Sequence, residues 1–286
     1  MIRVVSASHY LQPLHDEEPL PKLDDALREL CREDFRRTDR FIQLALLGSA
    51  RCATGYGLQA TCGVYLGSGL GPIGNNIVTQ QQLIRDREIP KPFNFINTLG
   101  TSAGFYIARN LGLRGQNIFI SRRSASLEAV LSIAIADLML GAVGQALVGV
   151  VEEATLPLAA HRQRQGLVEA LPLSEGSHWL LLEAGDTGGR QIQLMRFADY
   201  AALEGFLKPL RGSGARLYCT RGMETRFAEN LRQMFPDNAR QNPTVAFHDS
   251  LEAAWLTQFL TAGGLDKLFM VSGDNVRGWT LFQFSA

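Results

Sequence analysis

The sequence predicts an α/β protein built around a buried strand-helix-strand unit of a parallel sheet, with layers on both faces. The clearest signal is the segment Asn117–Glu152, which reads as strand, turn, helix and strand. Both strands are apolar runs without alternation, as in sheets buried on both faces. The helix, about Ala125–Leu140, is apolar all round its axis, so we expect neighbouring layers to cover every side of it. Strands and helices alternate again later in the chain, which predicts one domain of two α/β halves, about 1–185 and 186–286.

Apolar runs, proline-rich breaks and capping residues define the elements of the first half. Thr38-Asp39 is a capping pair that opens an amphipathic helix, and Pro13, Pro19 and Pro21 indicate a loop. In chain order we expect strand Met1–Ser6, a loop to Leu23, helices Asp24–Phe35 and Thr38–Ala53, strand Cys62–Gly67, a polar helix, strand Phe93–Leu99, a helix ending near Leu111, strand Asn117–Ser121, helix Ala125–Leu140 and strand Gln145–Glu152.

The second half repeats the pattern in a shorter form after an irregular stretch. Its elements should be strands His178–Glu183 and Gln191–Met195, helix Tyr200–Leu210, strand Ala215–Cys219, helices Glu224–Met234 and Ser250–Thr261, and strands Lys267–Val271 and Thr280–Phe284.

Composition excludes several classes of protein. The 28 basic side chains balance 28 acidic ones, so we expect no nucleic-acid partner. The four cysteines are scattered without C-x-x-C spacing, which argues against a zinc site or a disulfide framework and favours reduced thiols in the cytoplasm. No apolar run reaches the roughly 18–20 residues of a membrane span, and the N-terminus does not read as a secretion signal.

A glycine-rich turn, Gly69–Gly74, fits the dinucleotide pattern G-x-G-x-x-G and follows a strand. The acidic residue that such sites place after the next strand is missing, because Glu88 lies in a polar loop bounded by prolines. Glycines that let two backbones pass closely explain the pattern equally well. We therefore expect no nucleotide cofactor.

A second motif, Gly100–Gly104, fits the nucleophile elbow G-x-S-x-G with Ser102 at its centre. His248 lies downstream, as the base of an α/β-hydrolase would. Against this, Pro92 and Asn94 make the preceding strand poor, and small residues on a helix commonly serve close packing. His248 also has the position of an ordinary helix cap, and the other histidines share no metal-like spacing, so no metal site is predicted.

Five further motifs lie along the chain: Arg37–Gln43, Leu66–Gly71, Gly112–Gly115, Gly149–Glu152, and Glu175-Gly176 with Leu181-Leu182-Glu183. In order and spacing they resemble segments of the β-ketoacyl-acyl carrier protein synthases of the thiolase superfamily. The resemblance implies a thiolase-like five-layer αβαβα sandwich that is normally dimeric. The second half is shortened here, most of all between Glu183 and Cys219.

The departures from this family lie at its catalytic positions. The nucleophilic cysteine, at the start of the buried helix, falls on Ser124, and the two catalytic histidines fall on Thr220 and His248. The family's lysine is replaced in the region of Pro243, and its gating loop is replaced by Ser272–Gly278. A serine hydroxyl needs a dedicated base that a thiolate does not, and no base is apparent in the sequence.

Loss of the cysteine, one histidine and the lysine from a retained core describes a pseudo-enzyme. The resemblance then implies a chain-length factor, most like the reduced subunits of bacterial aryl polyene pathways. Such a subunit forms a heterodimer with an active β-ketoacyl synthase and meets acyl carrier protein transiently. No catalytic residue and no cofactor are expected. Two alternatives remain open: a serine acyltransferase or hydrolase using Ser124 or Ser102 with His248, and a self-associating structural relic.

Two segments are predicted to serve that partnership. In the resembled family, the segment ahead of the first buried helix crosses the dimer interface and reaches the end of the partner's acyl tunnel. Here it contains Phe93, Asn94, Phe95 and Thr98. Arg122 and Arg123, at the entrance of the buried helix, are expected to be interfacial or structural, because arginine suits bidentate pairing with carboxylates at interfaces.

Overall fold

The structure of the protein is a computed structural model. It describes residues 1–15, 18–32, 38–167, 172–185, 189–220, 223–235, 248, 250–262, 267–274 and 276–285. The predicted end of the first helix at Phe35 and the region of Pro243 lie outside these ranges.

The described residues of the first half form five strands and most of the helices. Its strands are β1 (Ile2–Leu14), β2 (Gly63–Ser68), β3 (Asn117–Ser121), β4 (Gln145–Glu152) and β5 (Leu173–Ala184). Its helices are α1 (Asp24–Leu30), α2 (Arg40–Ala53), α3 (Ile73–Gln80), α4 (Pro92–Asn97), α5 (Gly100–Leu111), α6 (Ser126–Met139) and α7 (Leu158–Gln165). A π-helical turn, Gln81–Arg85, continues α3, and a 3₁₀ turn, Arg123–Ala125, precedes α6.

The second half contains four strands. These are β6 (Arg190–Phe197), β7 (Arg216–Cys219), β8 (Lys267–Asp274) and β9 (Gly278–Ser285). Its helices are α8 (Tyr200–Leu207), which a 3₁₀ turn extends to Leu210, α9 (Thr225–Met234) and α10 (Leu251–Ala262).

All the described strands belong to one sheet, in the order β3-β2-β4-β5-β1-β6-β9-β8-β7. β1 joins its two parts. It pairs antiparallel with β5 from Ile2 to Leu14, and its first residues, Ile2–Val4, also pair with β6. Beyond Val4 the register with β5 shifts, and β1 no longer contacts β6. The two halves therefore share one strand.

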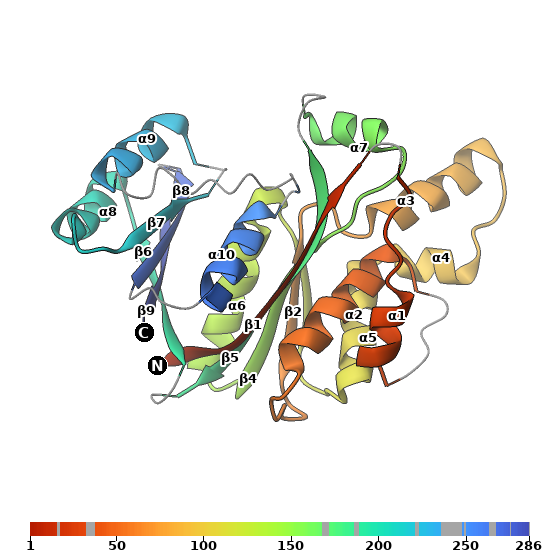
Figure 1. Cartoon of the computed structure of the whole chain (residues 1–286), viewed down its shortest axis with the longest axis horizontal. Coiled ribbons are helices and arrows are strands. Elements are labelled where there is room, and N and C mark those ends of the chain that lie inside the picture. The colour runs from red at the N-terminus through yellow and green to blue at the C-terminus, as the bar shows by residue number, and fades with distance from the viewer. Residues whose placement is uncertain are drawn as a thin grey trace.

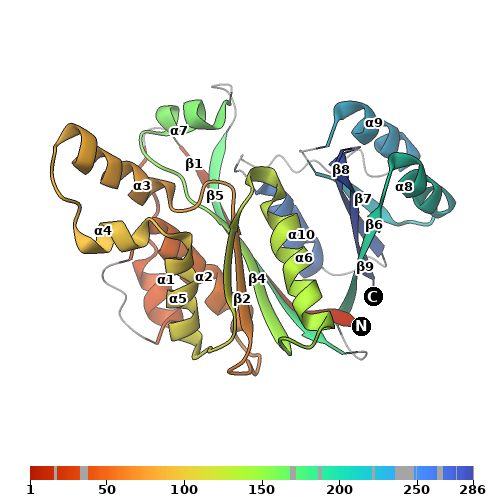
Figure 2. The same ribbon diagram turned by 180° about the vertical axis from the view of Figure 1, so that it is seen from behind.

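Helices and sheet alternate in five layers (Figures 1 and 2). α6 and α10 lie between the two parts of the sheet, where they bury a core with residues from both. α1, α2 and α5 cover the outer face of the first part, and α8 and α9 cover the outer face of the second. Along β8, Leu268 and Met270 face the middle layer, whereas Phe269 and Val271 face the outer helices. The predicted αβαβα sandwich is thus confirmed.

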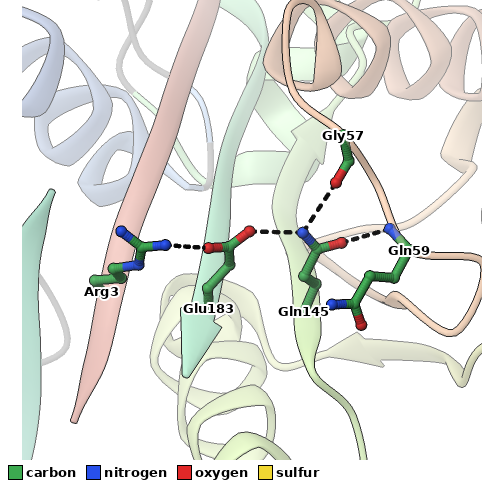
Figure 3. Close-up of polar contacts among 5 residues, drawn as sticks. All are labelled: Arg3, Gly57, Gln59, Gln145 and Glu183. Atoms are coloured by element: carbon green, nitrogen blue, oxygen red, sulfur yellow. Dashed lines mark hydrogen bonds and ion pairs between the residues drawn. The ribbon is translucent and has the colours of Figure 1, made fainter. Parts of the chain in front are cut away.

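A row of polar contacts crosses β1, β5 and β4 (Figure 3). Arg3 on β1 donates to Glu183 on β5 at 2.7 Å, and Gln145 on β4 donates to the other oxygen of that carboxylate at 2.6 Å. The amide of Gln145 also accepts from the backbone N–H of Gln59 and donates to the carbonyl of Gly57. The row satisfies these partly buried groups and fixes the loop before β2 to the sheet.

β1 is longer than predicted, because polar residues that read as a loop belong to the strand. Ser6 and Ser8 donate their hydroxyl protons to the carbonyls of Cys52 and Gly48 on α2, at 2.8 and 2.9 Å. Pro13 is tolerated because only β5 pairs with this end of the strand.

The predicted strand Phe93–Leu99 is wrong, since these residues form α4 and the turn after it. Pro92 occupies the first turn of the helix, where its missing N–H costs nothing. The first helix also ends earlier than predicted, at Leu30. There the backbone becomes extended at Cys31, and Arg32 donates its N–H to the side chain of Asn110 on α5.

The expectation that α6 is covered on every side is wrong for this chain. Its sheet-facing residues are fully buried, but Ile133, Met139 and Leu140 expose 36%, 76% and 80% of their surface. The chain itself therefore leaves part of the apolar surface of this helix uncovered. α7 was not predicted at all, because its short polar sequence has no clear apolar stripe.

Two glycines make room for the buried Trp179 on β5. A Cβ on Gly149, its partner across the β4–β5 ladder, would lie 2.1 Å from the indole, and one on Gly48 of α2 would lie 2.5 Å away. The indole nitrogen donates to Ser177 at 2.9 Å. The ring therefore fills the space that both glycines leave between sheet and helix.

We predict that Gly149→Ala destabilises the protein by at least about 1–3 kcal/mol, the usual cost of overpacking a core. The matched control is Gly205→Ala in α8, where a Cβ would meet nothing within 4 Å. This control should gain about 0.5–1 kcal/mol from the better helix former. Equilibrium unfolding in urea measures both, and equal stability of the two variants would contradict this packing.

Candidate functional site

A pocket of about 560 Å³ lies at the N-terminal end of α6, between the two halves. The first half contributes Ser124 and its neighbours from the turn after β3, and the second contributes Thr220 and parts of β6, β8 and β9. Its walls are formed by Arg122, Arg123, Ser124, Ala125, Glu128, Arg196, Phe197, Thr220, Ser272, Gly273, Arg277, Gly278, Trp279 and Thr280. The structure thus brings together two predicted positions, Ser124 and Thr220, that are distant in sequence.

The turn that presents Ser124 is held by a different serine. The hydroxyl of Ser126 accepts from the backbone N–H of Arg122 at 2.9 Å and lies within bonding distance of the carbonyls of Arg123 and Ser68. Arg123 has a φ of 52°, which is uncommon for a residue other than glycine. Ser124 therefore lies in a 3₁₀ turn ahead of α6 and not within the helix.

Arginine dominates the charge of the pocket. Arg122, Arg123, Arg196 and Arg277 lie on its wall together with one carboxylate, that of Glu128. Arg277 pairs with Asp274 at 2.6 Å, and Glu128 accepts from the hydroxyl of Ser272. Arg122 and Arg123 are both exposed at this pocket.

His248 does not line the pocket but lies in the interior, against His178 of β5. The two rings stack with centroids 5.2 Å apart, and their Nε2 atoms are 3.3 Å apart. Because Nδ1 of His248 accepts from the N–H of Ser250, its proton belongs on Nε2 and points at His178. Nδ1 of His178 then donates to Thr257, and burial together with His248 lowers the pKa of His178 well below its usual value.

The described walls of the pocket contain no catalytic base for Ser124. Neither histidine nor lysine is among the described residues that line the pocket. The one carboxylate there, Glu128, already accepts from Ser272. Cys219, just before Thr220, is no substitute nucleophile, because burial raises the pKa of its thiol to about 11. The described walls can bind an anion but offer no group to activate a hydroxyl.

The glycine-rich turn after β2 has its backbone donors occupied by carboxylates of the protein. Gly69 donates to Glu152 at 2.5 Å, and Gly74 donates to Glu153 at 2.7 Å. Glu153 is buried, and burial raises the pKa of its carboxyl to about 8. A dinucleotide would need these same N–H groups for its phosphates, so the turn serves the fold.

Packing also explains the G-x-S-x-G motif. A Cβ on Gly100 would lie 2.3 Å from the ring of Phe119, and one on Gly104 would lie 2.0 Å from the side chain of Asn117, both on β3. Ser102 donates its hydroxyl proton to the carbonyl of Ile96 at 2.7 Å. Since α4 and not a strand precedes α5, no nucleophile elbow forms here.

The predicted gate residues lie on α4 and just after it. Phe93 and Phe95 expose 42% and 62% of their surface, and Thr98 donates to the carbonyl of Phe95 at 2.7 Å. Asn94 accepts at its carbonyl from Asn75 of α3, which ties α4 to that helix.

The sequence predicted only some of the residues of this pocket. The Arg122-Arg123 doublet was visible, but Arg196 and Arg277 come from separate strands of the second half, and no spacing connects them. The pairing of His178 with His248 was missed for the same reason. Within the described ranges, no group of three potential ligands could hold a metal ion, and no helix could cross a membrane.

Comparisons with known proteins agree with this fold. The family model described as the N-terminal domain of β-ketoacyl synthase matches residues 9–169. A structure of the ishigamide ketosynthase/chain length factor has a TM-score of 0.67 at 17% identity, over 93% of this chain and 85% of that one. A ketosynthase from module 6 of the bacillaene synthase of Bacillus subtilis 168 has a TM-score of 0.64 at 12% identity, over 100% and 72%.

A third similar structure is a complex of a type II polyketide synthase acyl-carrier protein with its ketosynthase bound to the hexaketide. It has a TM-score of 0.66 at 11% identity, over 100% of this chain and 99% of that one. No curated protein matches the sequence. Because the family model covers more than half of the residues, the chain belongs to the β-ketoacyl synthase family.

Proposed function

We propose that the protein is a non-catalytic ketosynthase-like subunit, a chain-length factor that pairs with an active β-ketoacyl synthase. One observation carries the proposal. The pocket that holds the family's nucleophile position has Ser124 and Thr220 on its walls but no base among its described residues. Condensation needs an activated nucleophile and stabilisation of the developing oxyanion, and both are large terms in the rate.

The surface of the chain supports pairing with a second subunit. Among the described strands, β3 lies at one edge of the sheet and pairs only with β2. α5 and α6 both pack against this strand. On α4, on α5, which packs against β3, and in the turn between these two helices, large apolar residues are exposed: Phe93, Phe95, Ile96, Leu99 and Phe105. An edge strand flanked by so much apolar surface associates unless it is covered.

The proposed partner is a homologous synthase, and the proposed substrate is an acyl chain on an acyl carrier protein. The similarity to the ishigamide ketosynthase/chain length factor and to a ketosynthase in complex with its carrier protein supports this choice. We infer a role in bacterial polyketide or fatty-acid-type biosynthesis, with an aryl polyene as the product class that the shortened second half favours.

We predict that the purified protein has no condensing activity and that Ser124→Cys does not create it. A cysteine supplies the nucleophile but not the missing base and oxyanion donors. Intact-mass analysis after incubation with acyl carrier protein thioesters should show no stable adduct on the wild-type chain. Radiolabelled condensation assays should show no product from either form.

A stable acyl adduct on wild-type Ser124 would contradict a non-catalytic role. It would instead favour the alternative of a serine acyltransferase or hydrolase. An adduct mapped to Ser102 would do the same, although its hydroxyl already donates to a backbone carbonyl. An active synthase assayed alone serves as the positive control.

A further prediction concerns chain length. If Phe95 closes the end of the partner's acyl tunnel, a growing chain that meets its ring cannot add a unit without overpacking. Overpacking costs about 1–3 kcal/mol and slows the next extension roughly ten- to hundredfold. In the reconstituted pair, Phe95→Ala should therefore shift the products toward longer chains, as read by mass spectrometry.

The matched control is Phe105→Ala, which removes another exposed aromatic ring, from the neighbouring helix α5. It should leave the product lengths unchanged. If Phe95→Ala leaves an intact complex that makes products of the original length, Phe95 is not part of the gate. If it weakens assembly without changing the lengths, the residue is interface core only.

A further inference from the structure

We propose that a second pocket, at the C-terminal end of α6, binds a small neutral molecule with an apolar body and one hydrogen-bonding group. This pocket has a volume of about 550 Å³. It shares no lining residue with the pocket around Ser124, and the length of α6, about 20 Å at 1.5 Å per residue, separates the two. The inference concerns the isolated chain, so it does not depend on the pairing proposed above.

The pocket forms where β1 and β6 stop pairing. β6 pairs with β9 from Gln191 to Phe197, but it pairs with β1 only over residues 190–192. Beyond that point the start of β1, the end of β5, the last turns of α6 and Gln193–Met195 of β6 enclose a space close to the N-terminus in Figure 1. None of its lining residues belongs to β9, so the pocket lies along the edge of β6 that faces β1.

The walls of this pocket are apolar. Ile2, Ile135, Leu138 and Ile192 form its floor as part of the core between the two halves, and each exposes 5% of its surface or less. Among the described lining residues there is no Asp, Glu, Lys or Arg. An ionised ligand group would lose its hydration without meeting an opposite charge on a lining side chain, so the walls favour a neutral ligand.

The rim can adapt to the shape of a ligand. Met1, Met139 and Met195 come from three different elements, and Met139 exposes 76% of its surface. Methionine is unbranched and flexible, and its sulfur is polarizable, so it packs against apolar bodies of different outline. The rim therefore does not demand one exact ligand shape.

Hydrogen bonding is available on one side of the pocket. The exposed Gln193 offers its amide, and on the side facing β1 the described residues include no strand partner for Gln193–Met195. Successive residues of a strand direct their backbone groups to alternate edges, so at least one of these three presents its N–H and C=O to the pocket. Apolar walls with a few polar groups are typical of small-molecule sites, which usually measure about 300–1,000 Å³.

The ligand class follows from these walls. A hydrocarbon body would pack against the floor and the methionines, and a hydroxyl or amide group would turn toward β6. The same polar group on a charged molecule would gain nothing further from the lining side chains.

The test is fluorescence titration of the full chain with 1-aminoanthracene, a neutral probe that brightens in apolar surroundings. Displacement by decan-1-ol is compared with displacement by decylamine, which has the same chain length and is protonated at neutral pH. We expect saturable binding of the probe and displacement by the alcohol. Displacement by the amine should need about ten times its concentration or more, because the ammonium group must lose its hydration.

Two variants change the pocket in different ways. Met139→Glu places a charge at the rim and should weaken probe binding about tenfold or more. Ala184→Phe adds a ring to the wall at an exposed position and should have a similar effect by filling space. Thermal unfolding of each variant checks that it folds.

The matched control is Leu140→Glu. Leu140 follows Met139 directly and exposes 80% of its surface, but it does not line the pocket, so probe binding should be unchanged. The proposal is overturned if the wild-type chain shows no saturable binding, if the two glutamate variants lose affinity equally, or if decylamine competes as well as decan-1-ol. Sedimentation that shows a wild-type dimer and monomers for both glutamate variants would also overturn it, by assigning this surface to a contact between copies.

Discussion

The architecture depends on a single strand, β1, that completes both parts of the sheet. Along its length it satisfies the backbone of β5, and at Ile2–Val4 it also satisfies β6. Unpaired backbone groups of a buried strand are costly, so the second half cannot separate without exposing them. The position of one half relative to the other is therefore set by hydrogen bonds of the sheet and by the core around α6 and α10.

The pocket is a consequence of this constraint. One wall comes from the turn after β3 and the other from β6, β8 and β9, so its geometry exists only while the halves are joined. In a catalytic member of the family, this junction would hold nucleophile and base together. Here it holds Ser124, Thr220 and arginine, while the one histidine at a family position, His248, is enclosed with His178 in the interior.

Sequence reasoning succeeded where a local pattern carries the structure. The unit of β3, α6 and β4 was predicted nearly to its boundaries, because its strands are continuous apolar runs and glycine ends the helix. It failed where contacts with residues distant in the sequence determine the structure. The polar half of β1 is a strand because it pairs with β5 and because its serines bond to α2. The exposed face of α6 shows that an apolar pattern predicts which surface is to be covered, but not whether the same chain or another one covers it. The site was predicted by resemblance at Ser124 and Thr220, whereas Arg196 and Arg277 had no local signal.

The central claim is that this chain acts as the non-catalytic half of a heterodimer. The most direct measurement is native mass spectrometry of the tagged chain co-expressed with a β-ketoacyl synthase that has its cysteine and two histidines, with condensation assayed on the same fractions. The account predicts a one-to-one complex. Replacing the synthase cysteine by alanine should abolish its activity, whereas Ser124→Ala should leave the activity unchanged. A chain that remains alone or pairs only with itself, or a complex that loses activity with Ser124→Ala, would contradict it.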